Sequence, residues 1–178
     1  MIAISVIGGT MEQELLRADN LQLNMVEKYS QMVYRLAFSM MKNKYDADDI
    51  HQEVFVKFLK KTPRFDNEEH EKAWFIRVTV NCCTNYHKTA WKRKTVSLSE
   101  YERQEEAEIP IEQPDPDDLI ETVKRLPEKY RAVIHLFYYE EMSVEEVAKA
   151  LHRRTSTVRT QLVRARRMLG EWLAEEKG

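Results

Sequence analysis

The sequence has little glycine, proline or cysteine, and each shortage argues against a class of protein. Its 178 residues include 4 Gly, 5 Pro and 2 Cys. So few glycines and prolines, together with 33% charged residues, favour helices joined by short connections over a β-sandwich or a glycine-rich nucleotide-binding fold. The two cysteines, Cys82 and Cys83, are adjacent and cannot form a disulfide framework, which favours a reducing, cytoplasmic location.

Long apolar segments are missing as well. No apolar run approaches the roughly 18 residues that a membrane-spanning helix needs, so we expect no insertion into a membrane. Residues 1–9 are apolar, but they are too few and lack the basic residues of a signal peptide. Met11 resembles a natural start, which makes the first ten residues an extension, and we expect all of residues 1–19 to be flexible.

The motifs of the common enzyme classes are absent from the sequence. It contains no P-loop, GxGxxG, HExxH or CxxC pattern. Its five histidines are dispersed without metal-ligand spacing: His51, His70, His87, His135 and His152. We therefore expect a protein that is not an enzyme and that has no metal or cofactor. The vicinal cysteines leave a soft-metal or redox role open, but adjacent helical residues point about 100° apart, so core packing of one of them is favoured.

The formal net charge of −2 conceals a strong segregation of charge. Residues 95–118 contain nine acidic residues and one basic residue, so the rest of the chain has 27 basic against 21 acidic residues, a net charge of +6. Residues 86–94 hold four basic residues and residues 152–167 hold six arginines, with no acid in either segment. Such blocks are usually solvated faces, but two of them on separate predicted helices favour binding to a polyanion.

The first half of the chain predicts three amphipathic helices. The first covers residues 20–42, the second is capped by Asp46 and ends before Pro63, and the third runs from about Glu69 to Trp91. The residues expected to face the core are Leu23, Val26, Tyr29, Val33, Leu36 and Met40 on the first, Ile50, Val54, Phe58 and Leu59 on the second, and Trp74, Val78, Cys82 and Tyr86 on the third. For Trp74, exposure at a binding surface stays open beside burial.

The second half predicts a compact unit of four helices. A short helix at 119–126 is followed by Pro127, which suits the start of a helix reaching Glu140. Ser143 and Glu146 form a capping box for the third helix, and Thr155 or Ser156 caps the fourth after a turn at 152–154. The residues expected inside are Tyr130, Val133, Leu136 and Phe137, then Val144, Val147, Ala148 and Leu151, then Val158, Leu162, Ala165 and Leu169.

These patterns predict an all-α fold with two small helical domains. We expect the domains at residues 20–94 and 119–172, with a C-terminal tail at 173–178. Residues 95–118 contain three prolines and show no helical period, so they are interpreted as a flexible acidic linker. Its 24 residues reach roughly 80 Å when fully extended, which lets the two domains occupy distant sites on one target.

The last two helices have the pattern of a helix-turn-helix, because a short turn joins them and the second is rich in arginine. Residues near the start of such a second helix meet base edges in the major groove, while its flanks meet phosphates. The residues that lie off its apolar face are Thr155, Thr157, Arg159, Thr160, Val163 and Arg164. A solvated basic helix in an ordinary bundle is the alternative, and the agreement of capping box, turn and arginines favours DNA.

The sequence also resembles the bacterial sigma-70 family, specifically the small two-domain extracytoplasmic-function (ECF) sigma factors. The resemblance covers about residues 20–94 and 119–172. Its motifs are Asp-Ala-Asp-Asp-Ile-His-Gln-Glu-Val-Phe at 46–55, Trp-Phe-Ile-Arg-Val-Thr-Val-Asn at 74–81, Leu-Pro-Glu-Lys-Tyr-Arg-Ala-Val-Ile at 126–134, Met-Ser-Val-Glu-Glu-Val-Ala at 142–148, Thr-Val-Arg at 157–159 and Arg-Ala-Arg at 164–166. Both sets of motifs, in this order and on either side of an acidic linker, are highly specific.

The resemblance implies a factor that binds the bacterial RNA polymerase core and directs initiation at promoter DNA. The N-terminal domain would be sigma region 2, docking on the β′ clamp helices through Asp46, Asp49, Gln52, Glu53 and Phe55. The same domain would melt and read the −10 element through Phe65, Asp66, Asn67, Trp74, Arg77, Asn81, Asn85, Lys88, Lys92, Arg93 and Lys94. The C-terminal domain would be region 4, which meets the β flap and reads the −35 element through Arg153, Arg154, Thr155, Thr157, Arg159, Thr160, Val163 and Arg164. An antisigma factor is a further expected partner.

Three positions depart from the family pattern. His152 stands where the family usually has Gly, and Asn85 and His87 stand where members often carry an acid or an arginine. These departures bear on promoter preference. The alternative function, a stand-alone helix-turn-helix transcriptional regulator, would explain residues 119–172 and leave the N-terminal motifs unused.

Overall fold

The computed structural model describes residues 3–41, 43–61, 63–97 and 119–175, and all regular structure among them is helical. The helices are α1 (Ala3–Met41), α2 (Lys44–Lys61), α3 (Glu68–Ser97), α4 (Leu119–Arg125), α5 (Glu128–Tyr138), α6 (Val144–Ala150) and α7 (Thr155–Glu175). None of these helices is long and apolar enough to cross a membrane. The expected all-α fold is confirmed.

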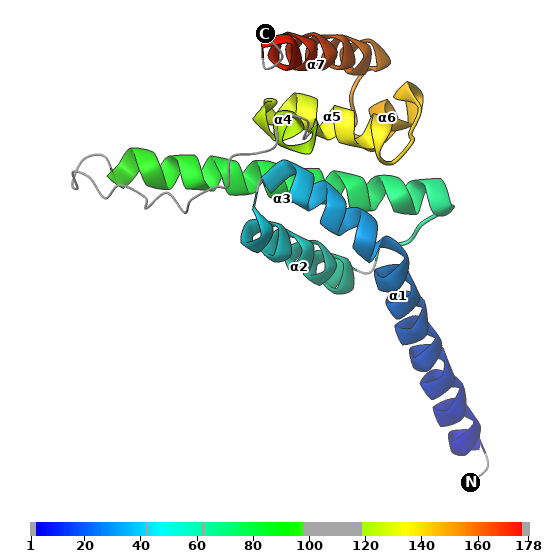
Figure 1. Ribbon diagram of the computed structural model, residues 1–178. Coiled ribbons are helices and arrows are strands. Elements are labelled where there is room, and N and C mark those ends of the chain that lie inside the picture. Colours follow the sequence, from blue (N-terminus) through cyan, green and yellow to red (C-terminus); the bar gives the residue numbers. More distant parts are fainter. Residues whose placement is uncertain (1–2, 42, 62, 98–118, 176–178) are drawn as a thin grey trace.

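The first unit is a bundle of α1, α2 and α3, whose apolar sides meet in one core (Figure 1). At its centre Phe75 is fully buried and its ring lies 4.6 Å from that of Tyr29 and 5.1 Å from that of Phe58, centroid to centroid. The predicted core residues that are buried here are Tyr29, Val33, Leu36, Met40, Ile50, Val54, Phe58 and Cys82. Val26 packs against this core while partly exposed.

The predicted buried stripe of α3 is wrong by about one residue. Trp74 and Val78 are only half-buried and Tyr86 is exposed, whereas Phe75, Ile76 and Thr79 are fully buried. The reason is that α3 is contacted from two directions, by α1 and α2 on one side and by α6 on another. Its buried surface is therefore wider than the single stripe that a period of 3.6 residues describes. Two other predicted core residues, Leu23 (60% exposed) and Leu59 (48% exposed), also point to solvent.

The caps of α2 and α3 are asparagines. The Asn43 side-chain oxygen accepts the Asp46 N–H at 2.9 Å. Asn43 is therefore the N-cap of α2, and the predicted Asp46 cap is wrong. Asn67 likewise accepts the His70 N–H at 2.8 Å at the start of α3. α2 ends at Lys61, as the following Thr-Pro pair requires.

Two predicted flexible boundaries differ in the structure. α1 begins at Ala3 and not near residue 20, so the expected flexible N-terminal segment is helical. No proline interrupts residues 1–62, and residues 12–18 are mostly good helix formers, so the helix continues upstream from the part that packs. α3 continues to Ser97, past the expected linker start at residue 95. Most of the predicted linker, residues 98–118, lies outside the described residues, as does the end of the predicted tail.

The second unit contains α4 to α7, and its helix starts follow the sequence closely. Ser143 and Glu146 form both bonds of the predicted capping box at the start of α6. α7 begins at Thr155, which leaves Arg154 as the preceding residue, so neither Thr155 nor Ser156 is the cap. The predicted interior is buried at Tyr130, Val133, Leu136, Val147, Ala148, Val158, Leu162 and Ala165, and partly buried at Phe137, Val144, Leu151 and Leu169.

The turn before α7 has a left-handed residue. His152 has φ 50°, a backbone conformation in which glycine is unstrained and most other residues are not. A glycine would be unstrained at this point, which accounts for the family pattern from which His152 departs. The Arg153 N–H donates to the Ala148 carbonyl at 2.9 Å and closes the turn.

The two units lie against each other. α5 packs on α1, α6 packs on α3, and α7 covers α5 and α6 from the far side (Figure 1).

Candidate nucleic-acid and protein interfaces

The first candidate surface is the solvent face of α7 near its start. Val158, Leu162 and Ala165 fix the orientation of this helix by packing inward. The other side then presents Thr157, Arg159, Thr160, Val163 and Arg164, all exposed, which we call the reading face. Val163 is 63% exposed although it is apolar. An apolar group beside arginines and threonines suits a helix that meets a thymine methyl and base edges in the major groove.

Two arginines near this face are already engaged. The Arg159 guanidinium donates to Glu145 of α6 at 3.0 Å, and both side chains are exposed. Arg153 is half-buried: its Nη1 donates to Gln161 Oε1 at 3.1 Å, and burial lowers its pKa. Of the other predicted residues, Arg154 is exposed and Thr155 is half-buried. Arg153 therefore lies off the reading face, in the turn before α7, and its predicted part in −35 recognition stays a prediction.

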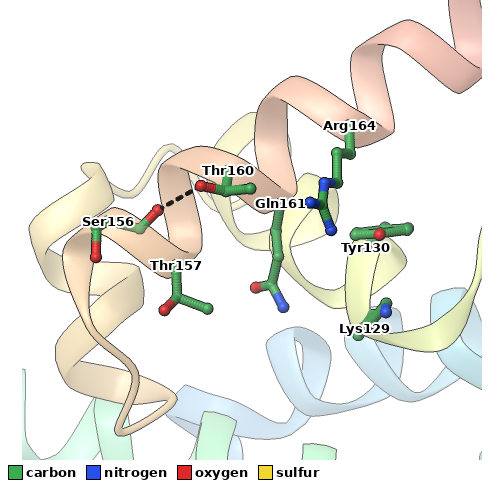
Figure 2. Close-up of a pocket in the computed structure, with 7 residues that line it drawn as sticks. All are labelled: Lys129, Tyr130, Ser156, Thr157, Thr160, Gln161 and Arg164. Carbon is green, nitrogen blue, oxygen red and sulfur yellow. Dashed lines mark hydrogen bonds between the residues drawn. The ribbon is translucent and has the colours of Figure 1, made fainter.

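A cavity of about 260 Å³ lies between the start of α5 and one edge of the reading face (Figure 2). It is lined by Lys129, Tyr130, Ser156, Thr157, Thr160, Gln161 and Arg164, with no acid among them. The Arg164 guanidinium beside Tyr130 lowers the pKa of that phenol, and Lys129 Nζ lies 4.9 Å from the centre of the Tyr130 ring. Two cations and several hydroxyl groups around one hollow suit a phosphate group. Sequence reasoning missed Lys129, Tyr130 and Gln161, because nothing local shows that the start of α5 faces α7.

The second candidate surface lies on α3. Asn81, Asn85 and Lys88 are exposed on one side of this helix, as predicted. Arg77 is half-buried, and its Nε is buried without a hydrogen-bond partner among the described residues. The predicted phosphate contacts Lys92, Arg93 and Lys94 belong to the same helix, and their side chains lie outside the part of the chain that the structure describes.

The loop before α3 lies at the N-terminal end of this surface. The Phe65 ring lies edge-on to Trp74 at 5.9 Å and to His70 at 5.5 Å, centroid to centroid, so Trp74 links loop and bundle. Asp66 is exposed and lies 3.5 Å from His70 Nδ1. The Asn67 side-chain oxygen is occupied as a helix cap. Phe65, Asp66 and the Asn67 amide nitrogen thus remain able to meet a ligand.

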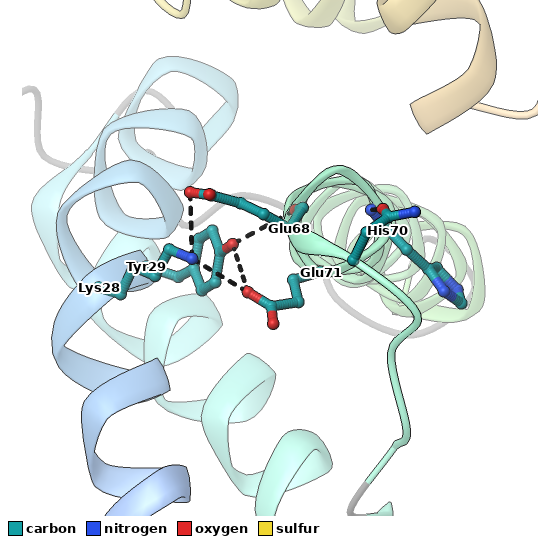
Figure 3. A network of polar contacts seen from close by, with 6 residues as sticks. Lys28, Tyr29, Glu68, His70 and Glu71 are labelled. Carbon is teal, nitrogen blue, oxygen red and sulfur yellow. Dashed lines mark hydrogen bonds and ion pairs between the residues drawn. The ribbon is translucent and has the colours of Figure 1, made fainter.

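A polar network anchors this loop to α1 (Figure 3). Lys28 Nζ lies 3.1 Å from both Glu68 and Glu71, and the Tyr29 hydroxyl donates to Glu71 at 2.9 Å. Burial, together with the Glu71 hydrogen bond, raises the pKa of Tyr29 to about 12. The same carboxylates raise the pKa of Lys28. The network fixes the first turn of α3 and with it the position of the loop.

The third candidate surface is the outer side of α2. Asp49, Gln52 and Glu53 are exposed as predicted, and Glu53 pairs with Lys57 at 2.5 Å. Asp46 is half-buried, and it accepts from Asn43 at 2.6 Å and from the Tyr86 hydroxyl.

Phe55 differs from its predicted docking role. It is only 7% exposed and its ring lies 5.6 Å from that of Phe75. The structure therefore places Phe55 in the core.

Sequence reasoning missed three exposed apolar residues on α2. Tyr45, Val56 and Leu59 are 82%, 46% and 48% exposed. With Asp49 and Gln52 they follow one another at steps of four, three, four and three residues, the spacing of a helix that lies along another helix. We call these five residues the docking face. This heptad spacing is visible in the sequence and could have identified the docking face without the structure.

The two cysteines are part of the packing. Cys82 and Cys83 are both buried, and Lys57 Nζ donates to Cys82 Sγ at 3.2 Å. Burial raises the pKa of both thiols, which keeps them protonated and unreactive. Among the described residues no group of three or more His, Cys, Asp or Glu side chains is placed to hold a metal ion.

Comparison with known proteins agrees with the division into two units. A model of sigma-70 region 2 matches residues 25–93, and a model of sigma-70 region 4 matches residues 117–169. The RNA polymerase sigma factor SigV of Bacillus subtilis is 33% identical over 152 residues, covering 85% of this chain and 90% of that protein. The ECF RNA polymerase sigma factor SigW of the same organism is 27% identical over 167 residues, covering 85% and 88%.

Solved structures share the fold. The sigma factor RpoE of Bartonella quintana, in complex with the anti-sigma factor NepR, gives a TM-score of 0.61 at 21% identity and covers 93% of this chain and 97% of that one. CnrH, in complex with the cytosolic domain of CnrY, gives a TM-score of 0.63 at 21% identity, with coverage of 88% and 90%.

Proposed function

The chain belongs to the sigma-70 family, in its extracytoplasmic-function group, and we propose a division of labour among the three surfaces described above. It is a sigma factor, not an enzyme: it binds the RNA polymerase core and directs initiation at promoters. Residues 20–94 act as region 2 and residues 119–172 as region 4. The observation that carries the division is that each unit presents an exposed polar helix face, with Asn81, Asn85 and Lys88 on α3 and with Thr157, Arg159, Thr160 and Arg164 on α7, while α2 presents a face of apolar and acidic residues.

The docking face of α2 binds the β′ clamp helices. Its apolar members bury surface against a partner helix, while Asp49, Gln52 and the neighbouring Glu53 set the register through polar contacts. Changing Gln52→Ala together with Glu53→Ala is expected to weaken core binding, measured by fluorescence titration of labelled protein with purified core. Glu27→Ala with Gln31→Ala, an exposed glutamate and glutamine on α1, is the matched control. Equal affinity for the two double variants would contradict the assignment.

The apolar half of the docking face has its own test. Leu59 is about half exposed, so covering the remainder contributes about 1 kcal/mol. Leu59→Ala should therefore weaken core binding several-fold while lowering the stability of the free chain by no more than about 1 kcal/mol. A loss of stability without a loss of affinity for the polymerase core would show that Leu59 acts only in the packing of the free chain.

The α3 surface reads and melts the −10 element. Asn81, Asn85 and Lys88 face the strand, and the loop with Phe65, Asp66 and Asn67 receives an extruded base, which needs stacking and hydrogen-bonding groups in one place. Substitutions in this loop should change −10 sequence preference in a promoter library. An unchanged preference would refute the loop's role.

Lys92, Arg93 and Lys94 contact phosphates. Lys92→Ala should lower the slope of log affinity against log salt by about one and leave sequence preference unchanged. A changed preference would contradict that role.

The reading face of α7 recognises the −35 element. Arg159 and Arg164 are placed to pair with guanine or phosphate, and the threonines and Val163 to meet phosphate and thymine methyl groups. Region 4 also meets the β flap, and an antisigma factor is a further partner, as in the complex of RpoE with the anti-sigma factor NepR named above. All these partners belong to the cytoplasm, where we place the protein.

Run-off transcription with purified bacterial core on a promoter library tests the whole proposal. Initiation that depends on the protein, at templates that share two spaced elements, is the expected result. Tight DNA binding without initiation would favour a stand-alone helix-turn-helix regulator, a function that the region 2 match does not support.

A further inference from the structure

The cavity at the edge of the reading face has positive but no negative charge in its lining. Its volume of about 260 Å³ has room for several water molecules, and its two charged residues are Lys129 and Arg164 (Figure 2). Glu128, the acid next to Lys129 in the sequence, instead accepts a hydrogen bond from Thr84 at 2.6 Å and lines a different cavity together with Arg153. Two cations that face one hollow favour an anion in it.

Both cations lie beside the same aromatic ring. Tyr130 is only 8% exposed, and Lys129 Nζ lies 4.9 Å from the centre of its ring. Figure 2 shows the Arg164 guanidinium next to the same side chain. A buried ring therefore positions an ammonium of α5 and a guanidinium of α7 around one point, although both charged residues are exposed to solvent.

The cavity opens along one edge of the reading face. A helix with its side chains is about 10–12 Å wide and the major groove is about 12 Å wide, so a helix in the groove has a DNA backbone along each of its edges. Thr157, Thr160 and Arg164 follow one another at steps of three and four residues and form one such edge. All three also line the cavity. The backbone of one DNA strand therefore passes the cavity when α7 lies in the groove.

The start of α5 can reach that backbone from outside the groove. α5 packs on α7, and the axes of packed helices are about 8–10 Å apart, so α5 lies beside the groove and cannot enter it. Lys129 is exposed at this end of α5. Its ammonium is a compact charge on a flexible stem, which suits a phosphate and gives affinity without sequence information.

We propose that the cavity binds one backbone phosphate of the −35 DNA, held between Lys129 of α5 and Arg164 of α7. The inference rests on the proposed assignment of the reading face to the −35 element. It adds a contact from outside the helix-turn-helix, which fixes the position of α7 along the groove, and it gives Arg164 a phosphate and not a base. A free phosphorylated molecule has the same chemistry, so the experiment has to distinguish the two sources.

A scan with single methylphosphonates tests the inference. Each one replaces a charged backbone phosphate of a labelled promoter duplex by a neutral group, and fluorescence anisotropy gives the affinity of the holoenzyme made from the full chain and purified core. One position, or two adjacent ones, on a single strand of the −35 element should cost about tenfold in affinity, because a hydrogen-bonded charge pair is lost. Lys129→Ala should reduce the loss at that position about threefold or more, as expected for groups in direct contact.

Lys149→Ala is the control, because Lys149 is an exposed lysine of α6 that lies 2.7 Å from Glu69 and does not line the cavity. It should keep the full loss at the same position. Equal losses at every position in the unsubstituted and Lys129→Ala proteins would overturn the inference.

Inorganic phosphate is the probe for a free ligand. At millimolar concentration and constant ionic strength it should leave the melting temperature of the free chain unchanged, because one contact supplies little affinity without the rest of the DNA. A rise in melting temperature that Lys129→Ala abolishes would assign the cavity to a free phosphorylated molecule and overturn the inference.

The same holoenzyme separates this inference from the proposed function. Failure to distinguish the −35 element from a shuffled sequence would contradict the proposed function itself. Selective binding of the −35 element without a phosphate coupled to Lys129 would contradict the inference alone.

Discussion

Glu145 is expected to restrain Arg159, the arginine that we propose reads the −35 element. Its carboxylate holds the Arg159 guanidinium at 3.0 Å, with the two side chains 64% and 66% exposed. An exposed pair of this kind contributes about 0.2–1 kcal/mol, which is roughly a 1.4- to 5-fold factor in affinity. Because Arg159 must leave Glu145 to reach a base, Glu145→Gln should tighten holoenzyme binding to a promoter by that factor.

A double-mutant cycle separates this restraint from simple repulsion between Glu145 and DNA. Arg159→Ala alone should cost about 1–3 kcal/mol if Arg159 reads a base. Glu145→Gln should then have no further effect in the Arg159→Ala background. Fluorescence anisotropy of a labelled promoter duplex at two salt concentrations gives the four affinities, and the gain should shrink at the higher salt. An equal gain from Glu145→Gln in both backgrounds would refute the reasoning.

Three further predictions concern stability. Ser143→Ala removes the hydroxyl oxygen that accepts the Glu146 N–H in the capping box and should cost about 1 kcal/mol in urea unfolding, whereas Ser156→Ala, at an exposed position, should change stability by less than about 0.5 kcal/mol. Phe75→Ala empties the centre of the aromatic cluster and should cost about 3–5 kcal/mol in the same assay; a loss below about 1 kcal/mol would show that the cluster is not the core. The folded state raises the pKa of Tyr29 from 10.0 to about 12. Its contribution to stability is therefore fully present below pH 10 and is lost as the pH rises towards 12. The free energy of unfolding should fall over that range, and Tyr29→Phe should reduce the fall.

Features that depend on residues close together in the sequence could be predicted from the sequence alone. The capping box of Ser143 and Glu146 depends on a spacing of three residues within one turn, so a local pattern predicts it. The inward face of α7 follows from Val158, Leu162 and Ala165, because this helix packs on one side only. The end of α2 before Pro63 follows from the covalent structure of proline.

Features that depend on a second element were harder to predict. The stripe of α3 was misplaced because helices pack on it from two directions, and the inward turn of Arg153 depends on the opposite unit. Phe55 belongs to a motif that resembles a docking signature, yet its ring fills the space beside Phe75. At the start of α2, Asn43 and Asp46 are both good caps three residues apart, and only the course of the backbone decides between them.

The double contact of α3 has a consequence for how the protein folds. Phe75 and Thr79 belong to the core of the first unit, whereas Val80 and Thr84, a few residues further along, face the second unit. One continuous helix therefore contributes side chains to the packing of both units, and neither unit is fully packed without it. Unfolding of either core removes contacts from this shared helix. We therefore expect the whole chain to unfold in one cooperative transition on heating.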